Sequence, residues 1–325
     1  MKIANLIVRW TIALAFATAI FAVSAQTYPV KPVRVIVPYA AGGMPDVLAR
    51  TLSIPLSSAL GQQFVVDNRP GAGGIGAADL VAKSPADGYT VFFSDIQQLA
   101  INPFLFTKLP YHPARDFTPV MLLGTVPLYI VAQESLNIKS LAELVAAAKL
   151  KPEILTYGSS GVGSIHQIAM EAMTAALGIK LIHVPYKGSA ASIPAFMGKQ
   201  TALIVAAASP QLDQYVKSGS ARMLAVTTAT RSPLYPDVPA VAETISGFDF
   251  SSEMGVVVPA GTPSGVVTQL SQELGTALKD PGVVQRLTSL GITVISSTPD
   301  GYSQNIKANL VKFQKAIQAA AIQPN

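Results

Sequence analysis

The sequence predicts an α/β protein of two Rossmann-like lobes that enclose a hinged cleft. Short runs rich in β-branched residues alternate with longer helical stretches, which is the pattern of βαβ crossovers and a mainly parallel sheet. Two runs, 118–133 and 250–261, interrupt this alternation because each reads as extended chain with no helix between its halves. A chain that crosses twice in this way forms two lobes. We therefore expect a first lobe of residues 26–125 and 250–325, and a second lobe of residues 126–249.

The expected elements follow in order along the chain. In the first lobe, apolar runs between turn residues predict strands at 33–37, 64–67 and 90–93, with helices from Pro45 to about Leu60 and over 75–83. In the second lobe, the same reading predicts strands at 155–157, 180–184, 202–205 and 223–226, and helices at 165–177, 189–197 and 210–218. The last stretch predicts a helix at 264–279, a second short helix, a strand at 292–295 and an amphipathic helix from about Pro299 to Ala321.

Residues 1–25 have the order of a secretory signal peptide. Lys2 and Arg9 flank the start of an apolar run that closes on the small residues of VSA. We expect cleavage after Ala25 and a mature protein in the periplasm. The apolar run is too short for a membrane span of about 20 residues, and the alternative is an uncleaved anchor.

The composition excludes several functions. The chain has no cysteine, which removes thiol catalysis, iron–sulfur clusters, cysteine zinc sites and a lipoprotein anchor. Without Lys2 and Arg9 the net charge falls from +5 to +3, and no basic stripe is interleaved with aromatic residues. Nucleic acid is therefore not an expected partner. We expect a freely soluble monomer that needs no cofactor or metal.

Three loops that follow strands are candidates for ligand binding, because ligands of open parallel sheets bind beyond the carboxyl ends of strands. The first is PYAAGGMPDVLAR (38–50). Its Gly42 and Gly43 are expected to leave backbone N–H groups uncovered, at a helix N-terminus that favours a small anion. Asp46 falls in the first helical turn. The alternative is an ordinary glycine turn in which Asp46 only caps the helix.

The second and third loops add polar side chains. In YGSSGVGS (157–164), Ser159, Ser160 and Ser164 can donate to a carboxylate, or they can cap the helix that follows. In FSDIQQLAINP (93–103), the carboxylate of Asp95 would repel an anion unless the ligand also carries an amine, amide or hydroxyl. The alternative is that Asp95 caps the next helix.

Other motifs are weak. GAGGIG (71–76) matches a dinucleotide fingerprint, but three residues separate it from the preceding strand, and no acidic residue ends a following strand at the required spacing. No nucleophile elbow or HExxH motif is present. The three histidines are scattered, and His183 is expected to be a hydrogen-bonded core residue. A Ser–His–acid triad built from distant loops remains open.

Together, these segments resemble one family. The mature chain is similar to the periplasmic substrate-binding receptors of tripartite tricarboxylate transporters, the Bug receptors. The matching segments cover nearly all of the mature chain and are YPVKPVRVIVPYAAGGMPDVLAR, FVVDNRPGAGGIGA, ADGYTVFF, AINP, LPYHPARDFTPV, YGSSGVGS, HVPYKGSAAS, LAVTTATRSPLYPDVPAVAE and VVVPAGTP. The resemblance implies a type II-like periplasmic binding fold and a structural role for GAGGIG.

The resemblance also implies how a ligand is held. A carboxylate would be gripped largely through backbone amides and ordered water at the first loop. The family's binding residues carry over onto Tyr39, Gly42, Gly43 and Asp46 in the first lobe, and onto Ser159, Ser160, Gly163 and Ser164 in the second. To these we add Ala41, Ser94 and Asp95 from the first and third loops.

Three departures from the family limit this transfer. Ala40 and Ala41 stand where the family usually has two prolines, which should loosen the loop. His166 lies one place before the usual histidine position, now Gln167, and is expected to face elsewhere. Asp95 replaces a small hydroxyl residue or glycine, and we expect it to set the choice of ligand.

The predicted function is therefore a periplasmic receptor that captures a small organic acid in the cleft. It would close about the two crossings near residues 125 and 250 and deliver the acid to membrane permease subunits, or act in sensing. One alternative is an exported hydrolase or isomerase of small acids with an unrecognised triad. Another is an interaction protein that binds a partner rather than a metabolite.

Overall fold

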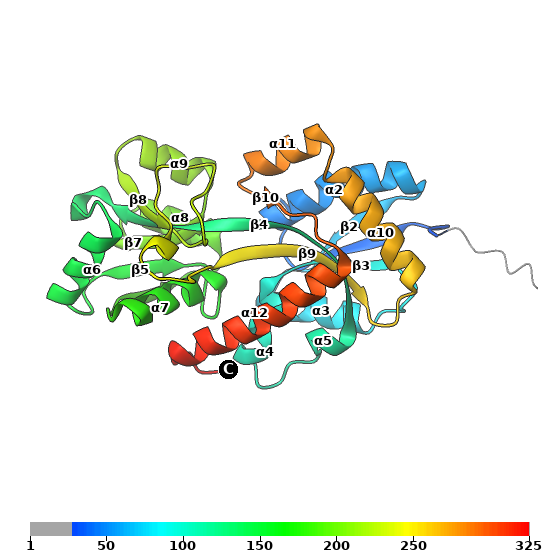
Figure 1. Cartoon of the computed structure of the whole chain (residues 1–325), viewed down its shortest axis with the longest axis horizontal. Coiled ribbons are helices and arrows are strands. Elements are labelled where there is room, and N and C mark those ends of the chain that lie inside the picture. Colours follow the sequence, from blue (N-terminus) through cyan, green and yellow to red (C-terminus); the bar gives the residue numbers. More distant parts are fainter. Residues whose placement is uncertain (1–27, 325) are drawn as a thin grey trace, which may run out of the picture.

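The computed structural model describes residues 28–324, and the predicted signal peptide with its cleavage site at Ala25 lies outside that range. Two lobes lie side by side and are joined by two long strands (Figure 1). The first lobe begins with β1 (Val33–Val37), α2 (Met44–Leu60), β2 (Phe64–Asn68), η1 (Ala72–Gly74), α3 (Ile75–Ala82), β3 (Thr90–Asp95), η2 (Gln97–Ile101), α4 (Asn102–Leu105) and α5 (Pro113–Asp116).

The chain then crosses to the second lobe through β4 (Phe117–Gln133). That lobe contains η3 (Glu134–Leu136), α6 (Leu141–Leu150), β5 (Thr156–Ser159), α7 (Ile165–Leu177), β6 (Ile182–Pro185), α8 (Ser189–Met197), β7 (Leu203–Ala207), α9 (Pro210–Lys217), β8 (Ala221–Val226) and η4 (Val241–Glu243). The chain returns through β9 (Ser251–Pro259) to α10 (Ser264–Ala277), α11 (Pro281–Ser289), β10 (Thr293–Val294) and α12 (Pro299–Ala319).

The strands form one sheet in the order β2-β1-β3-β9-β4-β7-β5-β6, with β8 and β10 also paired to β4. The predicted parallel pairing holds within each lobe, where β1 pairs with β2 and β3, and β5 pairs with β6 and β7. The crossing strands add antiparallel pairs, since β9 is antiparallel to both β3 and β4, and β4 is antiparallel to β7 and β8. The chain leaves the first lobe in β4 and returns in β9, so these neighbours must run in opposite directions.

Strand β4 belongs to both lobes. Its residues 117–127 pair with β9, and its residues 128–133 pair with β7 and β8. The extended run predicted at 118–133 is therefore confirmed as one continuous strand. The residue bounds expected for the two lobes stay a prediction.

Helix α12 adds a further connection between the lobes. Figure 1 shows it running from the first lobe beneath β9 toward the second. Its residues Phe313 and Ile317 are buried in the same apolar cluster as Leu128 of β4 and Met170 of α7. Leu105, at the end of α4, also lies in this cluster. The two lobes therefore share an apolar core on this side of the molecule.

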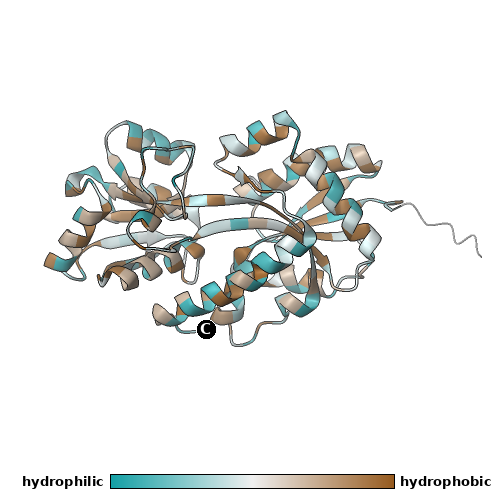
Figure 2. Ribbon diagram, viewed as in Figure 1, coloured by the Kyte–Doolittle hydropathy of each residue, from teal (hydrophilic) through white to brown (hydrophobic). Residues whose placement is uncertain are grey.

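The remaining core lies on both faces of the sheet. In the first lobe, α2 and α10 cover one face, and α3 with the start of α12 covers the other. Figure 2 shows hydrophobic residues concentrated along the strands and hydrophilic residues on outer helix faces. None of the helices within residues 28–324 is both long enough and apolar enough to span a membrane.

Candidate functional site

The first and third loops meet at one edge of the first lobe. Strands β1 and β3 are parallel neighbours, so their carboxyl ends lie side by side. The hydroxyl of Tyr39, two residues beyond β1, donates a hydrogen bond to the carboxylate of Asp95 at the end of β3. This contact joins two residues that the sequence assigned to separate loops.

The glycine amides of the first loop are not uncovered, contrary to expectation. The amide of Gly42 donates to the carboxylate of Asp46 at 2.9 Å, and that of Gly43 to the carbonyl of Ala40 at 3.3 Å. Gly42 has a φ of 82°, a conformation that favours glycine. Within residues 28–324, the amides of Ala40 and Ala41 have no protein partner. The backbone N–H groups of this loop that are free to bind a ligand therefore lie two residues earlier in the chain than predicted.

Asp46 is a fully paired acid. It is 2% exposed and accepts hydrogen bonds from Arg50 Nε at 3.0 Å and from Asn68 Nδ2 at 2.9 Å, besides that from Gly42. Burial opposes ionisation of Asp46, but these hydrogen bonds outweigh it and lower its pKa. The carboxylate thus stays ionised and is balanced by Arg50. Its place at the start of α2 agrees with the capping alternative.

Asp95 is buried in a different way. It is 7% exposed, and its Oδ1 accepts the amide of Gln97 at 2.7 Å, a turn that aspartate often forms with the chain two residues on. Burial raises the pKa of Asp95 to about 6, although the hydrogen bonds from Tyr39 and Gln97 act in the opposite direction. Asp95 thus forms a local turn just before η2, whose N-cap is Ile96 rather than Asp95. The role of Asp95 in ligand choice stays a prediction.

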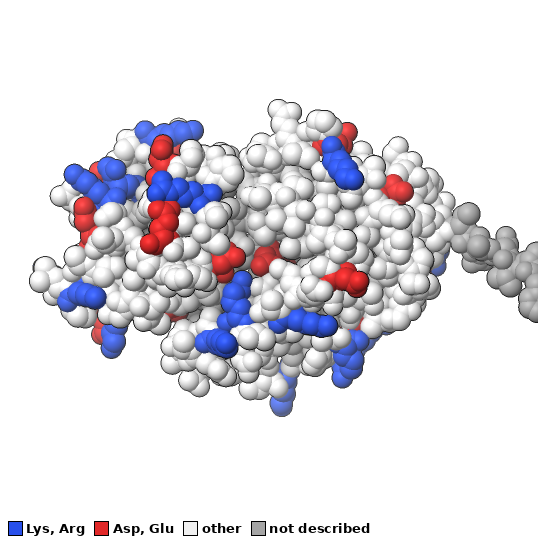
Figure 3. Space-filling view, viewed as in Figure 1, with Lys and Arg blue, Asp and Glu red and all other residues white. Residues whose placement is uncertain are grey.

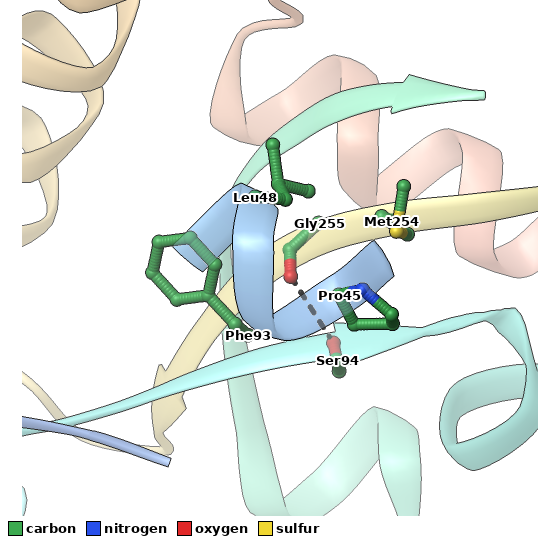
Figure 4. Close-up of a pocket in the computed structure, with 6 residues that line it drawn as sticks. All are labelled: Pro45, Leu48, Phe93, Ser94, Met254 and Gly255. Carbon is green, nitrogen blue, oxygen red and sulfur yellow. Dashed lines mark hydrogen bonds between the residues drawn. The ribbon is translucent and has the colours of Figure 1, made fainter. Parts of the chain in front are cut away.

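Ser94 lies inside the first lobe. It is 3% exposed, and its hydroxyl donates to the carbonyl of Gly255 in β9 at 3.4 Å. Figure 4 shows it beside a narrow cavity that leaves no room for a water molecule. The cavity is lined by Pro45, Leu48, Phe93, Ser94, Met254 and Gly255. Its small volume beside the start of α2 suits packing between helix and sheet rather than a metabolite.

The serines of the second loop pair with histidines. Ser159 Oγ lies 2.6 Å from His183 Nε2, and Ser160 Oγ lies 2.6 Å from His166 Nδ1. The prediction that His166 faces away is therefore wrong, because the turn before α7 brings its ring back onto Ser160. His183 is hydrogen-bonded as predicted, although it is only half-buried. Burial lowers the pKa of both histidines to about 4, so both rings are neutral near pH 7.

The turn that opens α7 is built by Ser164 and Gly163. The Ser164 hydroxyl accepts the amide of Gln167 at 3.3 Å and donates to the carbonyl of Gly161 at 2.7 Å. Ser164 is thus a helix cap. The amide of Gly163 donates to Gln167 Oε1 at 2.7 Å. The hydroxyl and amide of this turn are therefore engaged within the protein.

The two lobes touch at Gly163. Gln97 Nε2, from the third loop, donates to the Gly163 carbonyl at 3.3 Å. A Cβ added at Gly163 would lie 2.3 Å from Leu105 Cδ1. Gln97 and Leu105 were missed as site residues by the sequence reasoning. The signal that could have found them is FSDIQQLAINP itself, where only the first two residues after the strand were weighed.

The glycine motif 71–76 packs against this site. The carbonyl of Gly73 accepts hydrogen bonds from Gln98 Nε2 and Asn102 Nδ2, both at 3.1 Å. A Cβ at Gly74 would lie 2.6 Å from Gln98 Nε2 and 2.8 Å from Pro38 Cβ. Only glycine allows this approach, which holds the third loop against the end of β1. The motif thus has a structural function here.

On the face seen in Figure 3, charge is spread rather than concentrated. Figure 3 shows Lys and Arg side chains interspersed with Asp and Glu on both lobes of the visible face. Within the described part of the chain, no group of three or more histidine or acidic residues is placed to hold a metal ion.

Two lobes joined by β4 and β9, with the second loop of one hydrogen-bonded to the third loop of the other, define the architecture of a two-lobed solute-binding protein. Residues 48–322 match the family model described as the tripartite tricarboxylate transporter family receptor. The chain belongs to this receptor family, which confirms the resemblance inferred from its motifs.

Individual proteins similar to this chain support the same family assignment. The chain is 35% identical over 280 residues to Protein BugT of Bordetella pertussis, which covers 86% of each chain. The solved structure of R. palustris Rpa4515 with adipate has a TM-score of 0.83 and 33% identity, covering 92% of this chain and 100% of that one. MatC from Rhodopseudomonas palustris with bound malate has a TM-score of 0.77 and 28% identity, covering 89% and 100%. These proteins confirm the predicted fold class.

Proposed function

We propose that this receptor is exported to the periplasm, captures a small organic acid by its carboxylate between the lobes, and delivers it to the permease subunits of a tripartite transporter. The signal-peptide pattern of residues 1–25 supports export. Ligands of two similar proteins, adipate and malate, are both carboxylates. A role in sensing rather than transport is the alternative if no cognate permease is present.

One observation carries this proposal. Among residues 28–324, the amides of Ala40 and Ala41 have no protein partner, and they lie just before the N-terminus of α2 in the first lobe. That helix end favours an anion. The nearby Asp46 is balanced by Arg50, so its charge opposes an anion less. The serines of the second loop come from the opposite lobe. The carbonyl of Gly163 in that loop accepts a hydrogen bond from Gln97 of the third loop.

Among the predicted contacts, we retain those of the two facing loops. They are Tyr39, Ala41, Gly42, Gly43, Asp46, Ser159, Ser160, Gly163 and Ser164, with Asp95 behind Tyr39. Gly42, Gly43, Asp46 and Ser164 are proposed to shape the loops rather than to donate, since their own polar groups are engaged. Ser94 is left out because its hydroxyl bonds inside the sheet.

A thermal-shift screen of residues 26–325 tests the proposal. The panel holds aliphatic dicarboxylates, acidic amino acids, aromatic acids and nicotinate-type compounds. A ligand at about 100 times its Kd stabilises the folded state by about 2.7 kcal/mol. The neutral diamide of each responding acid is the matched control and should give no shift. A diamide that stabilises as well as its acid would contradict recognition of the carboxylate.

The hydrolase alternative is favoured by the close pairs Ser159–His183 and Ser160–His166. A triad needs an acid that orients the imidazole. Within residues 28–324, neither ring accepts or donates a hydrogen bond to a carboxylate. Prolonged incubation of the protein with a stabilising acid should return that acid unchanged by mass spectrometry, and any conversion would support the enzyme instead.

A further inference from the structure

Asp95 is a buried acid without a cationic partner. Its two oxygens accept hydrogen bonds from the Tyr39 hydroxyl and the Gln97 amide, both from neutral groups. Among the described residues, no lysine or arginine forms an ion pair with Asp95. By contrast, Asp46 in the neighbouring loop pairs with Arg50. An ionised carboxylate that is buried without a counter-charge is costly, so this group is poised to bind a proton.

The side chains that surround Asp95 are uncharged near neutral pH. Tyr39 bonds it from the first loop, and the phenols of Tyr111, before α5, and Tyr302, in α12, interact with it electrostatically. Burial raises the pKa of all three tyrosines, so they stay neutral. Gln98 Oε1 accepts the amide of Asp95 at 3.0 Å and carries no charge.

Other titratable groups lie on neighbouring elements of both lobes. Glu253 of β9 lies near Tyr302 and is hydrogen-bonded by Asn309, with Lys312 at 3.9 Å. Across the cleft, His166 and His183 face the second loop and are neutral near pH 7. Burial raises the pKa of both carboxyls, but Lys312 and Asn309 act against it at Glu253, whereas Asp95 has only neutral donors and its pKa rises to about 6.

Tyr39 links Asp95 to the proposed ligand. It bonds Asp95 through its hydroxyl, and its backbone leads directly into the unpaired amides of Ala40 and Ala41. An anion held there would bring a second negative charge toward Asp95, and like charges in a buried site favour protonation. We infer that Asp95 takes up a proton when an anionic ligand binds, so that the receptor captures its acid together with a proton. This inference rests on the proposed function.

Calorimetric titration with adipate and with malate tests the inference. Heats are measured at pH 7 in two buffers of different ionisation enthalpy, which gives the protons taken up per ligand. Both acids are fully ionised above about pH 6.5, so any proton goes to the protein. We expect about half to one proton per ligand, and an affinity that falls by up to about tenfold per pH unit above pH 7.

The variant Asp95→Asn identifies the group. It should abolish the proton uptake and the pH dependence, and bind more tightly than the natural protein at pH 8. If it does not fold, Asp95→Ser gives the same readout. The matched control is Asp213→Asn, which breaks another Tyr–Asp pair, that of Tyr235 and Asp213 in the second lobe. This control should leave the uptake unchanged.

Three results would overturn the inference. Binding without proton uptake, or with proton release, would show that Asp95 stays ionised and pairs with a donor on the ligand. Uptake that persists in Asp95→Asn would assign the proton to another group, such as His166. If neither acid binds while another acid of the thermal screen does, the titration is made with that acid, and binding of its anion without proton uptake overturns the inference while the proposed function stands.

Discussion

The variant Gly163→Ala tests whether this residue sets the approach of the two lobes. Gly163 has a φ of 73°, and an added Cβ would lie 2.3 Å from Leu105 Cδ1. The left-handed backbone costs an alanine about 1–2 kcal/mol, and overpacking costs about 1–3 kcal/mol more. Since Gly163 and Leu105 come from opposite lobes, the overlap is relieved either by a shift of the Leu105 side chain or by separation of the lobes. We expect the free energy of unfolding to fall by about 2–5 kcal/mol and the ligand-induced stabilisation to become smaller.

Gly178→Ala is the matched control. Gly178 ends the same helix, α7, with a φ of 61°, but a Cβ there would meet nothing within 4 Å. Its free energy of unfolding should therefore fall only by the backbone cost of about 1–2 kcal/mol. Urea unfolding of both variants, with and without a ligand, measures the difference. Leu105→Ala should restore part of the loss in Gly163→Ala, as a favourable coupling in a double-mutant cycle. Equal losses at both glycines, with no coupling to Leu105, would refute the reasoning.

Three further predictions concern the first lobe. Gly43→Val should abolish the ligand-induced thermal shift while changing the stability of the free protein by about 1 kcal/mol or less, because φ there is −71°; a normal shift would remove this loop from the site. Asp95→Ala should change the rank order of acids in the thermal screen, and an unchanged order would leave Asp95 no role in ligand choice. Asp95→Asn should alter stability with pH. The pKa of Asp95 rises from 3.8 to about 6 on folding, so the folded state binds more protons between these values. Through this group, the free energy of unfolding of the natural protein should thus fall by about 2 kcal/mol from pH 4 to pH 6, and by about 0.4 kcal/mol more before it levels off near pH 7. Asp95→Asn should remove this fall, and equal melting profiles of both proteins at pH 4 and pH 8 would contradict the shifted pKa.

Local signals made many elements predictable. Helix α8 was expected at 189–197 and α7 at 165–177, and both have these bounds. In α7, Ser164 caps the start and Gly178 ends it in the left-handed conformation. Strand β1 at 33–37 is also as predicted. In these cases the residues that determine the boundary are neighbours in the sequence.

One helix was missed although its signal is local. Helix α6 (Leu141–Leu150) begins after Ser140, whose hydroxyl accepts the amide of Glu143 at 3.2 Å. A serine followed three residues later by a glutamate is a known start signal. The bounds of this helix were thus predictable from its own residues.

The details of the site were less predictable because they depend on distant residues. The amide of Gly42 is occupied by Asp46, which in turn is fixed by Asn68, 22 residues away. His166 turns to Ser160 because the intervening glycines, with φ of 137° and 73°, fold the loop back. The contact of Leu105 with Gly163 joins the two lobes. No spacing in the sequence reports such contacts.

The two facing loops differ in how they can respond to charge. In the second lobe, Ser159 and Ser160 pair with neutral imidazoles, and such pairs can exchange donor and acceptor roles through the histidine tautomer. They tolerate either protonation state of a bound group. In the first lobe, unpaired amides and the start of α2 favour a negative charge, while Asp95 opposes it unless protonated. We therefore infer that the first lobe distinguishes ligands by charge, and that the second lobe mainly closes over whichever acid the first has accepted.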